Sequence, residues 1–202
     1  RVRNKKAYII SDRCIDCGEC IRVCPQHAKY AVMEHLSEKD KFRYKIALPA
    51  PALYGQFNNL ENIDYVLTGL KKMGFDKVVE VSKAAEYISS ATRNMMRTES
   101  LKKPVISTAC PAVVRLIRIR FPNLIPNLLP LYAPVDFAAK IAREEAIKET
   151  GLKDEEIGVF FISPCPAKRT SIKNPLGYSK SGVDGAIAMK EIYPQLVHNM
   201  DK

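Results

Sequence analysis

From residue 45 onward, short apolar runs alternate with stretches that are apolar on one helical face. The runs have the length of buried strands, and we place them at residues 45–48, 77–81, 104–107, 157–162 and 185–189. Helical spacing predicts helices at residues 59–73, 82–96 and 134–149, and from residue 190 on. Strands alternating with helices indicate an α/β fold with a mostly parallel sheet and helices on both of its faces.

Local signals mark where several of these elements begin and end. Ser82 is a candidate cap for the helix that follows it, and Pro111 suits the first turn of a further helix. Gly74 and Gly151 stand where helices would stop. Residues 121–130, which contain several prolines, are expected to form a loop.

The first 44 residues have a different texture, with short apolar segments around a run of cysteines. A strand is expected at residues 7–10 and a short element at 29–33, while the charged residues 34–45 resemble a linker. We therefore divide the chain into a partial ferredoxin-type domain, 1–44, and a second domain, 45–202. The second would comprise a first lobe, about 45–154, and the start of a second lobe, 155–202.

The cysteine run carries the most specific chemical signal in the chain. Its spacing, C-x2-C-x2-C-x3-C-P, is that of bacterial ferredoxins, whose thiolates bind [4Fe–4S] clusters. Zinc sites more often use paired C-x2-C units separated by a longer loop, and disulfides between such close cysteines would be strained. The sequence therefore favours an iron–sulfur cluster bound by Cys14, Cys17, Cys20 and Cys24.

The role of Cys24 has two interpretations. In two-cluster ferredoxins the fourth cysteine of this run binds the other cluster, which would leave the first cluster one ligand short. Because residue 1 is not methionine, we expect a fragment whose upstream part carries a matching cysteine run. Alternatively, Cys24 completes a single cluster. In the first case, the chain alone is expected to retain little or no cluster.

Charge and hydropathy limit the kinds of molecule that the chain is expected to bind. The formal net charge is +10, but the basic residues are spread along the chain, and the local group Arg115, Arg118 and Arg120 is expected on a solvated helix face. This argues against nucleic-acid binding and allows docking of an acidic electron-transfer partner. The longest apolar runs are too short to cross a bilayer. The placement of the cysteines favours a reducing, cytoplasmic location over a disulfide scaffold.

The two remaining cysteines occupy equivalent positions. Cys110 and Cys165 each follow a predicted strand, and each is followed by proline. Ligands of open α/β sheets bind beyond the carboxyl ends of the strands, and a helix N-terminus favours a thiolate or an anionic cluster. Either cysteine alone would be read as a small buried hydrophobic residue. As a pair beside a ferredoxin run, they favour metal binding.

Two segments around these cysteines resemble the first two active-site motifs of the iron-only ([FeFe]) hydrogenases. They are Ser-Thr-Ala-Cys-Pro at 107–111 and Ser-Pro-Cys-Pro-Ala-Lys at 163–168. The resemblance extends over nearly the whole chain, including residues 45–51, 74–87, 121–128 and 183–192.

The resemblance implies roles for individual residues. Cys110 and Cys165 would bind the cubane of the H-cluster, and Lys168 would contact its diiron part. The ferredoxin-type clusters would pass electrons between this site, where H2 and protons are the substrates, and a ferredoxin or similar carrier.

The chain departs from the family pattern at several positions. Ala109 replaces the cysteine that relays protons to the diiron site, and Ser171 stands where the relay has a glutamate. Val113 replaces the usual tryptophan. The third motif, with two more cysteines, is absent up to Lys202, so the fragment alone is expected to hold no complete H-cluster and to be inactive.

Loss of the proton relay suggests slow turnover. A positioned acid or base typically contributes about 100- to 10,000-fold in rate. By analogy with the family, we therefore expect a slow hydrogenase or a sensor of H2 or redox state with attached regulatory domains. The alternative is a non-catalytic iron–sulfur scaffold, for electron transfer or regulation, that kept the hydrogenase fold. Cysteines of the third motif in the missing C-terminal region would favour the first hypothesis.

Overall fold

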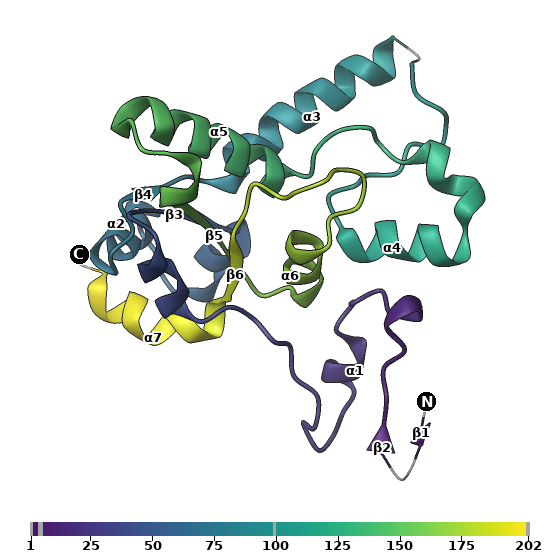
Figure 1. Ribbon diagram of the computed structural model, residues 1–202, viewed down its shortest axis with the longest axis horizontal. Coiled ribbons are helices and arrows are strands. Elements are labelled where there is room, and N and C mark those ends of the chain that lie inside the picture. The colour runs from purple at the N-terminus through teal and green to yellow at the C-terminus, as the bar shows by residue number, and fades with distance from the viewer. Residues whose placement is uncertain (1, 4–5, 99, 201–202) are drawn as a thin grey trace.

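A four-stranded parallel sheet forms the centre of the computed structural model, which describes residues 2–3, 6–98 and 100–200. The strand order is β4–β3–β5–β6 (Figure 1). The strands are β3 (Tyr44–Pro49), β4 (Lys77–Val78), β5 (Ile157–Ser163) and β6 (Gly185–Ala188). All three pairings are parallel, which confirms the predicted sheet.

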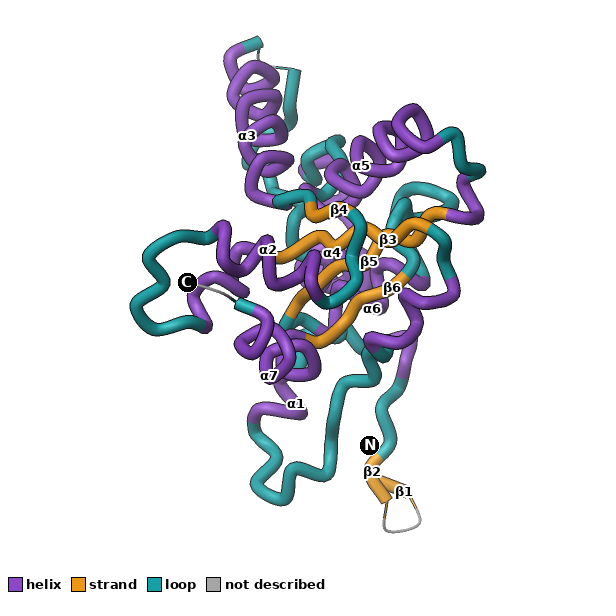
Figure 2. The backbone as a smooth tube through the Cα atoms, turned by 90° about the vertical axis from the view of Figure 1, so that its left-hand side faces the viewer, coloured by secondary structure: helices purple, strands orange, loops and turns teal. Residues whose placement is uncertain are grey.

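Helices cover both faces of this sheet. On one side α3 packs against α5, and on the other α2 packs against α7 (Figures 1 and 2). The helices that follow β3 are α2 (Asp64–Lys72), α3 (Val81–Arg97), α4 (Pro111–Arg120), α5 (Pro134–Thr150), α6 (Pro166–Lys173) and α7 (Met189–Asn199). The α/β architecture with helices on both faces is therefore confirmed.

One continuous core holds these layers together. β3 and β5 pair from Tyr44 opposite Ile157 to Pro49 opposite Ile162, and every residue of β5 is buried. A strand with helices on both faces must be apolar along its whole length, which explains the unbroken run at 157–162. The proposed lobe boundary at 154/155 thus lies between strands that are neighbours in one sheet.

Residues 34–45 do not form a linker, as the sequence had suggested. Glu34 makes a parallel bridge to Ile187 in β6, and Leu36–Lys41 form a 3-10 helix. Leu36 and Phe42 pack against the core. The segment is therefore attached to the sheet beside β6. The domain boundary at 44/45 stays a proposal.

Several shorter predictions are also corrected. Residues 104–107 do not join the sheet: Ile106 makes only an isolated bridge to Leu128, because its backbone bonds go to Asn127 and Leu129. At the N-terminus, the hairpin of β1 (Val2–Arg3) and β2 (Lys6–Ala7) replaces the strand expected at 7–10, and residues 29–33 form no regular element.

Helix ends follow the predicted signals at some positions and not at others. Pro111 opens α4, and Gly74 and Gly151 stop helices with φ values of 88° and 69°. The first predicted helix starts later, at Asp64, whose amide donates to the side chain of Asn62 at 2.9 Å. Ser82 lies inside α3 and does not cap it.

Two further segments differ from expectation. Residues 121–130 contain the 3-10 helix η4 (Pro122–Asn127) instead of an irregular loop, and α6 was not predicted. Within the described residues, no helix is both long and apolar enough to cross a bilayer.

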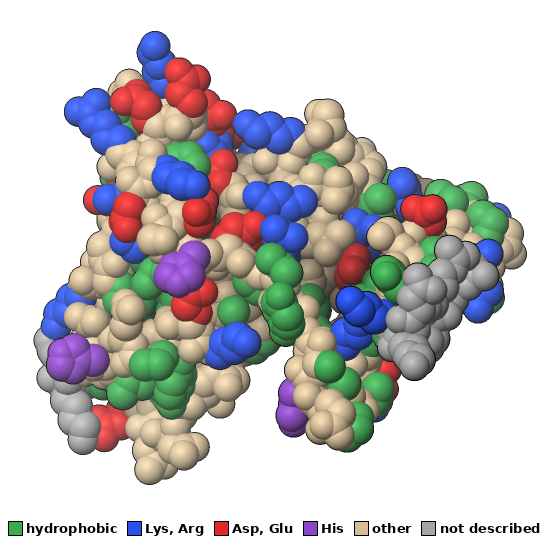
Figure 3. All heavy atoms as spheres, turned by 60° about the horizontal axis from the view of Figure 1, so that its bottom comes forward, with side chains coloured by type: hydrophobic (Ala, Val, Ile, Leu, Met, Phe, Trp, Pro, Cys, Tyr) green, Lys and Arg blue, Asp and Glu red, His purple; other side chains and the backbone are tan. Residues whose placement is uncertain are grey.

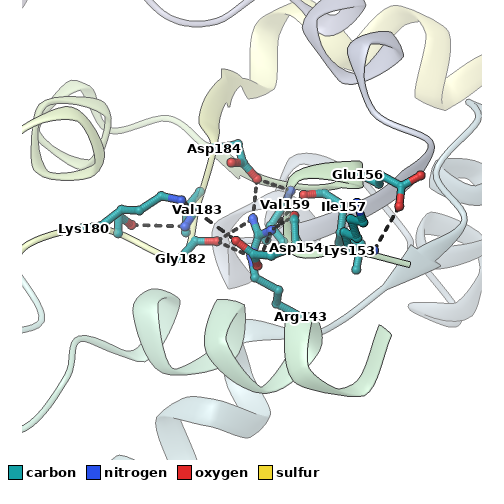
Figure 4. A network of polar contacts seen from close by, with 11 residues as sticks. Arg143, Lys153, Asp154, Glu156, Ile157, Val159, Lys180, Gly182, Val183 and Asp184 are labelled. Atoms are coloured by element: carbon teal, nitrogen blue, oxygen red, sulfur yellow. Dashed lines mark hydrogen bonds and ion pairs between the residues drawn. The ribbon is translucent and has the colours of Figure 1, made fainter. Parts of the chain in front are cut away.

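Arg143 fastens α5 to the ends of two strands (Figure 4). Its guanidinium donates to the carbonyl oxygens of Ile157 at 2.8 Å and Gly182 at 3.1 Å, and it pairs with the Asp184 carboxylate. Asp184 also accepts from the amide of Val159 at 2.7 Å. Because the Arg143 side chain is only 13% exposed, these partners replace water.

We expect Arg143→Ala to lower the free energy of unfolding by about 3 kcal/mol, because it leaves a partly buried carboxylate and two carbonyls without their partner. Urea unfolding measures the change. Lys148→Ala, at an exposed position of the same helix, should change it by less than about 0.5 kcal/mol. Equal effects of both substitutions would contradict this role of Arg143.

Candidate metal centre

Cys110 and Cys165 occupy matching positions at the starts of two helices. Cys110 is the N-cap of α4 and Cys165 the N-cap of α6, with proline next in each case. The hydroxyl of Ser107 accepts from the amide of Ala109 at 3.3 Å, and that of Ser163 accepts from the amide of Cys165 at 3.2 Å. The two motifs thus have the same local structure: a serine hydroxyl bonds the amide two residues further on, just before the helix begins.

Lys168 connects the two motifs. It projects from the first turn of α6, and its Nζ donates to the carbonyl oxygen of Ala109 at 2.7 Å. Burial lowers the pKa of Lys168 overall, and the Asp136 carboxylate offsets part of this effect. The thiols of Cys165 and Cys110 also raise the pKa of this lysine. Both thiols therefore lie within electrostatic range of one ammonium group.

A cavity of about 730 Å³ lies beside this lysine. Most of its wall is apolar, with residues such as Val114 and Leu129, and Lys168, Ser171 and Asp136 are among its few polar side chains. A mostly apolar pocket with a few convergent polar groups is typical of a ligand or cofactor site. Ser171, at the position of the expected relay glutamate, thus lines the same cavity as Lys168.

Asp136 and Tyr178 are site residues that sequence reasoning missed. Asp136 is only 7% exposed, and its carboxylate accepts from the hydroxyl of Ser181 at 2.9 Å. Burial and the neighbouring Asp136 raise the pKa of Tyr178. The one available signal was an acidic residue in the first turn of α5, and the helix dipole explains such a residue without any site.

The cysteine run forms a turning loop around the short helix α1 (Glu19–Arg22). Asp16 and Gly18 adopt left-handed φ values of 56° and 79°, which bend the chain sharply. The amide of Asp16 donates to the sulfur of Cys14 at 3.4 Å, although burial raises the pKa of that thiol overall. Backbone amides, that of Ala28 foremost, lower the pKa of Cys24.

This donor set fits an iron–sulfur cluster. Amide hydrogen bonds to sulfur favour thiolates, and thiolates are the ligands of such clusters. All six cysteines are free of disulfides. Among the described residues, no three His, Cys, Asp or Glu side chains form a preassembled metal site, so the ligand roles of Cys14, Cys17, Cys20 and Cys24 stay predictions from their spacing and chemistry.

The cysteine loop lies against the helices of the second site. The carboxylate of Asp16 is 3.8 Å from the Nε of Arg115 in α4, and Gly18 faces Pro166, where an added Cβ would lie 3.5 Å from the proline ring. Figure 1 shows this segment, in purple, beneath α4 and α6. The prediction of a solvated face is therefore wrong for Arg115, whose side chain is 17% exposed.

Basic and acidic side chains are interspersed over the face shown in Figure 3. Several basic side chains are paired, for example Lys77 with Glu145 and Glu149 at 3.0 and 2.8 Å. The net charge is therefore not gathered on this face into the single-sign patch that nucleic-acid binding would need.

A parallel sheet covered by helices, two cysteines at helix starts and a ferredoxin-type loop together fit the class of iron–sulfur proteins. The family model "Iron only hydrogenase large subunit, C-terminal domain" matches residues 43–199, and the 4Fe-4S binding domain matches residues 7–30. The chain belongs to the iron-only hydrogenase large-subunit family.

Two curated relatives illustrate the range of this likeness. The NADP-reducing hydrogenase subunit HndD of Solidesulfovibrio fructosivorans is 25% identical, over 93% of this chain and 36% of the relative. The cytosolic Fe-S cluster assembly factor NAR1 of Saccharomyces cerevisiae is 23% identical, over 59% of this chain and 24% of the relative. The chain therefore spans about a third or less of the length of these relatives.

Solved structures show the same fold. An [FeFe]-hydrogenase from work on oxygen inactivation of the H cluster superposes with a TM-score of 0.65 and 16% identity, covering 77% of this chain and 42% of that one. A variant of the [FeFe]-hydrogenase HydA1 from Chlamydomonas reinhardtii superposes with a TM-score of 0.64 and 16% identity. The match covers 82% of this chain and 45% of that one.

We expect Ser163→Ala to lower the free energy of unfolding by about 1–3 kcal/mol, because the amide of Cys165 loses its acceptor beside a buried strand end. Urea unfolding measures the change. Ser107→Ala removes the same bond at an exposed turn, where water replaces it, and should cost less than about 0.5 kcal/mol. A cost at Ser163 no larger than that at Ser107 would refute the role given to its hydroxyl.

Proposed function

We propose that this chain contributes the first two ligand motifs of an [FeFe]-hydrogenase active site, with Cys110 and Cys165 as ligands of its cubane. The observation that carries the proposal is the position of Lys168. Its ammonium bonds the carbonyl next to Cys110 and lies within electrostatic range of both thiols. Lys168 would hold the diiron part of the cofactor, at the edge of the 730 Å³ cavity.

The cofactor, when bound, supplies the redox chemistry that interconverts H2 with protons and electrons. The role of the chain's own residues would be to bind and orient it. Cys110 and Cys165 would supply thiolates at the starts of α4 and α6, where the helix dipoles favour a negative charge. Cys14, Cys17, Cys20 and Cys24 would hold a [4Fe–4S] cluster that exchanges electrons with a ferredoxin or similar carrier. A cytoplasmic location accompanies this proposal, because a reducing compartment keeps free thiols available as ligands.

The finer proposal is a slow or sensing function. Ala109 has no exchangeable proton at the relay position, and Ser171 offers the cavity a hydroxyl in place of a carboxyl group. Positioned acids and bases contribute about 100- to 10,000-fold, so turnover without them would be slow. Slow turnover suits a protein that reports H2 or redox state to attached regulatory domains.

A non-catalytic iron–sulfur scaffold is the second candidate. The match to NAR1, described as a cluster assembly factor, favours it, as does the absence of a relay thiol at Ala109. In this alternative the cubanes would be bound but no diiron unit would be inserted. Detection of H2 turnover by the full-length protein would exclude it.

Replacing Ala109 by cysteine tests the relay. We expect Ala109→Cys in the full-length protein with its cofactor to raise proton reduction about 100-fold, the low end of what a positioned acid contributes. Gas chromatography of H2 evolved from a reduced viologen measures the rate. Ala112→Cys places a thiol further along α4 and should have no effect. An unchanged rate in Ala109→Cys would mean that proton delivery is not limited at this position.

Replacing Cys165 by serine tests its assignment as a ligand. In the full-length protein, Cys165→Ser should abolish the electron paramagnetic resonance signal of the active-site cubane, because a weaker oxygen donor replaces a thiolate. The signal of the ferredoxin-type cluster should persist. Cys20→Ser is the reciprocal control and should affect the ferredoxin-type cluster instead. An unaltered active-site signal in Cys165→Ser would remove Cys165 from the ligand set.

A further inference from the structure

Glu34 is a nearly buried carboxylate that the proposed chemistry does not use. Its side chain is only 10% exposed, and it lies where the chain passes from the cysteine loop to the sheet. Burying a charged group costs free energy of hydration, so a buried carboxylate needs hydrogen-bond or ion-pair partners. Among the described residues, its polar partners belong to β6 and α6.

The first set of partners is the backbone of β6. The amide of Glu34 donates to the carbonyl of Ala186 at 3.0 Å, and its carboxylate accepts from the amide of Ala186 at 2.9 Å. Gly185 makes room for this approach, because a Cβ there would lie 3.0 Å from the Cγ of Glu34. Glu34 therefore closes the edge of β6 with both its backbone and its side chain.

The second set is a pair of cations on α6. The Nε of Arg169 donates to the carboxylate at 3.1 Å, and the Nζ of Lys173 is 3.4 Å away. The two residues are one helical turn apart, so they present their charges to the same side of α6. Arg169 directly follows Lys168 in the chain.

The neighbours of Glu34 favour the ionised form of its carboxyl group. Burial raises the pKa of the carboxyl group, but the amide of Ala186, with Lys173 and Arg169, lowers it below its ordinary value overall. A charge-assisted bond of this kind contributes more than a neutral one.

The cysteine loop reaches α6 as well, from its other end. Gly18 lies against Pro166, the first residue of α6, and Asp16 approaches Arg115 of α4. Lys168 lies between the loop contact at Pro166 and the Glu34 contact at Arg169, and the N-cap Cys165 directly precedes Pro166. The N-terminal segment thus contacts the active-site helix at two separate points.

We propose that Glu34 is a positioning residue that couples the ferredoxin-type segment to α6 and so sets the placement of Lys168 and Cys165 relative to Cys110. The proposal rests on the proposed function only in calling α6 an active-site helix. Glu34 itself touches neither thiol. It acts through Arg169 and Lys173, which keep α6 against the edge of β6.

Glu34→Gln is the test variant, because it keeps the size of the side chain and an acceptor for the amide of Ala186 while removing the charge that pairs with α6. Glu38→Gln is the matched control: it lies in the same segment and pairs with Lys41 in an exposed position. Both variants are prepared in the full-length protein with its clusters. Hydrogen exchange of residues 166–173 and the resonance signals of both clusters are compared with the unsubstituted protein.

In Glu34→Gln, we expect exchange in α6 to accelerate about tenfold or more, since hydrogen bonds to charged groups are stronger than bonds between neutral groups. Exchange in α5 should stay unchanged. The active-site cubane signal should shift, and that of the ferredoxin-type cluster should not. Glu38→Gln should change none of these.

Unaltered exchange in α6 would overturn the proposal, as would an equal acceleration in α5, which would show a general loss of stability. Faster exchange in α6 with an unshifted active-site signal would also overturn it, since the cluster would then be insensitive to the placement of the helix. If the unsubstituted protein shows no active-site cubane signal, the proposed function fails. The exchange rates of α6 and α5 would still decide whether Glu34 positions the helix.

Discussion

The contact between the Lys168 ammonium and the Ala109 carbonyl oxygen is the interaction on which the site depends. It joins α6 to the turn before α4, and the two bonded residues are 59 positions apart in the sequence. A partly buried lysine is costly unless it is paired. Burial lowers the pKa of Lys168 overall, and Asp136, Cys165 and Cys110 offset only part of this effect.

The surrounding fold supports this contact by fixing the starts of both helices. At the end of β5, the hydroxyl of Ser163 accepts a hydrogen bond from the amide of Cys165. Before α4, the hydroxyl of Ser107 accepts one from the amide of Ala109, next to Cys110. Arg143 and Asp184 secure α5 and the strand ends, and Glu34 secures α6. An anionic group bound between the two helix N-termini would meet their amides, the lysine and both thiols together.

The features that could be predicted from the sequence are those decided by local pattern. The unbroken apolar run at 157–162 is typical of a strand buried on both faces, and the cysteine spacing indicated a cluster. Pro166 gives the same helix-start signal as Pro111. The helix α6 was nevertheless not predicted, because it is short and has few apolar residues.

The failures concern residues whose partners are distant in sequence. Glu34 in a charged segment suggested a solvated linker, because its partner Arg169 is 135 residues away. Asp136 resembled an ordinary first-turn acid for the same reason, since Ser181 is 45 residues away. Residues 104–107 had the composition of a strand, but the competing contacts of Ile106 with residues 127–129 could not be read from the local pattern.

The most direct test of the central claim is an iron-edge anomalous map from crystals of the full-length protein with its clusters. The account predicts one iron centre within bonding distance of the sulfurs of both Cys110 and Cys165, beside Lys168. Iron bound to only one of these thiols, or none between α4 and α6 while the ferredoxin-type loop is occupied, would contradict it.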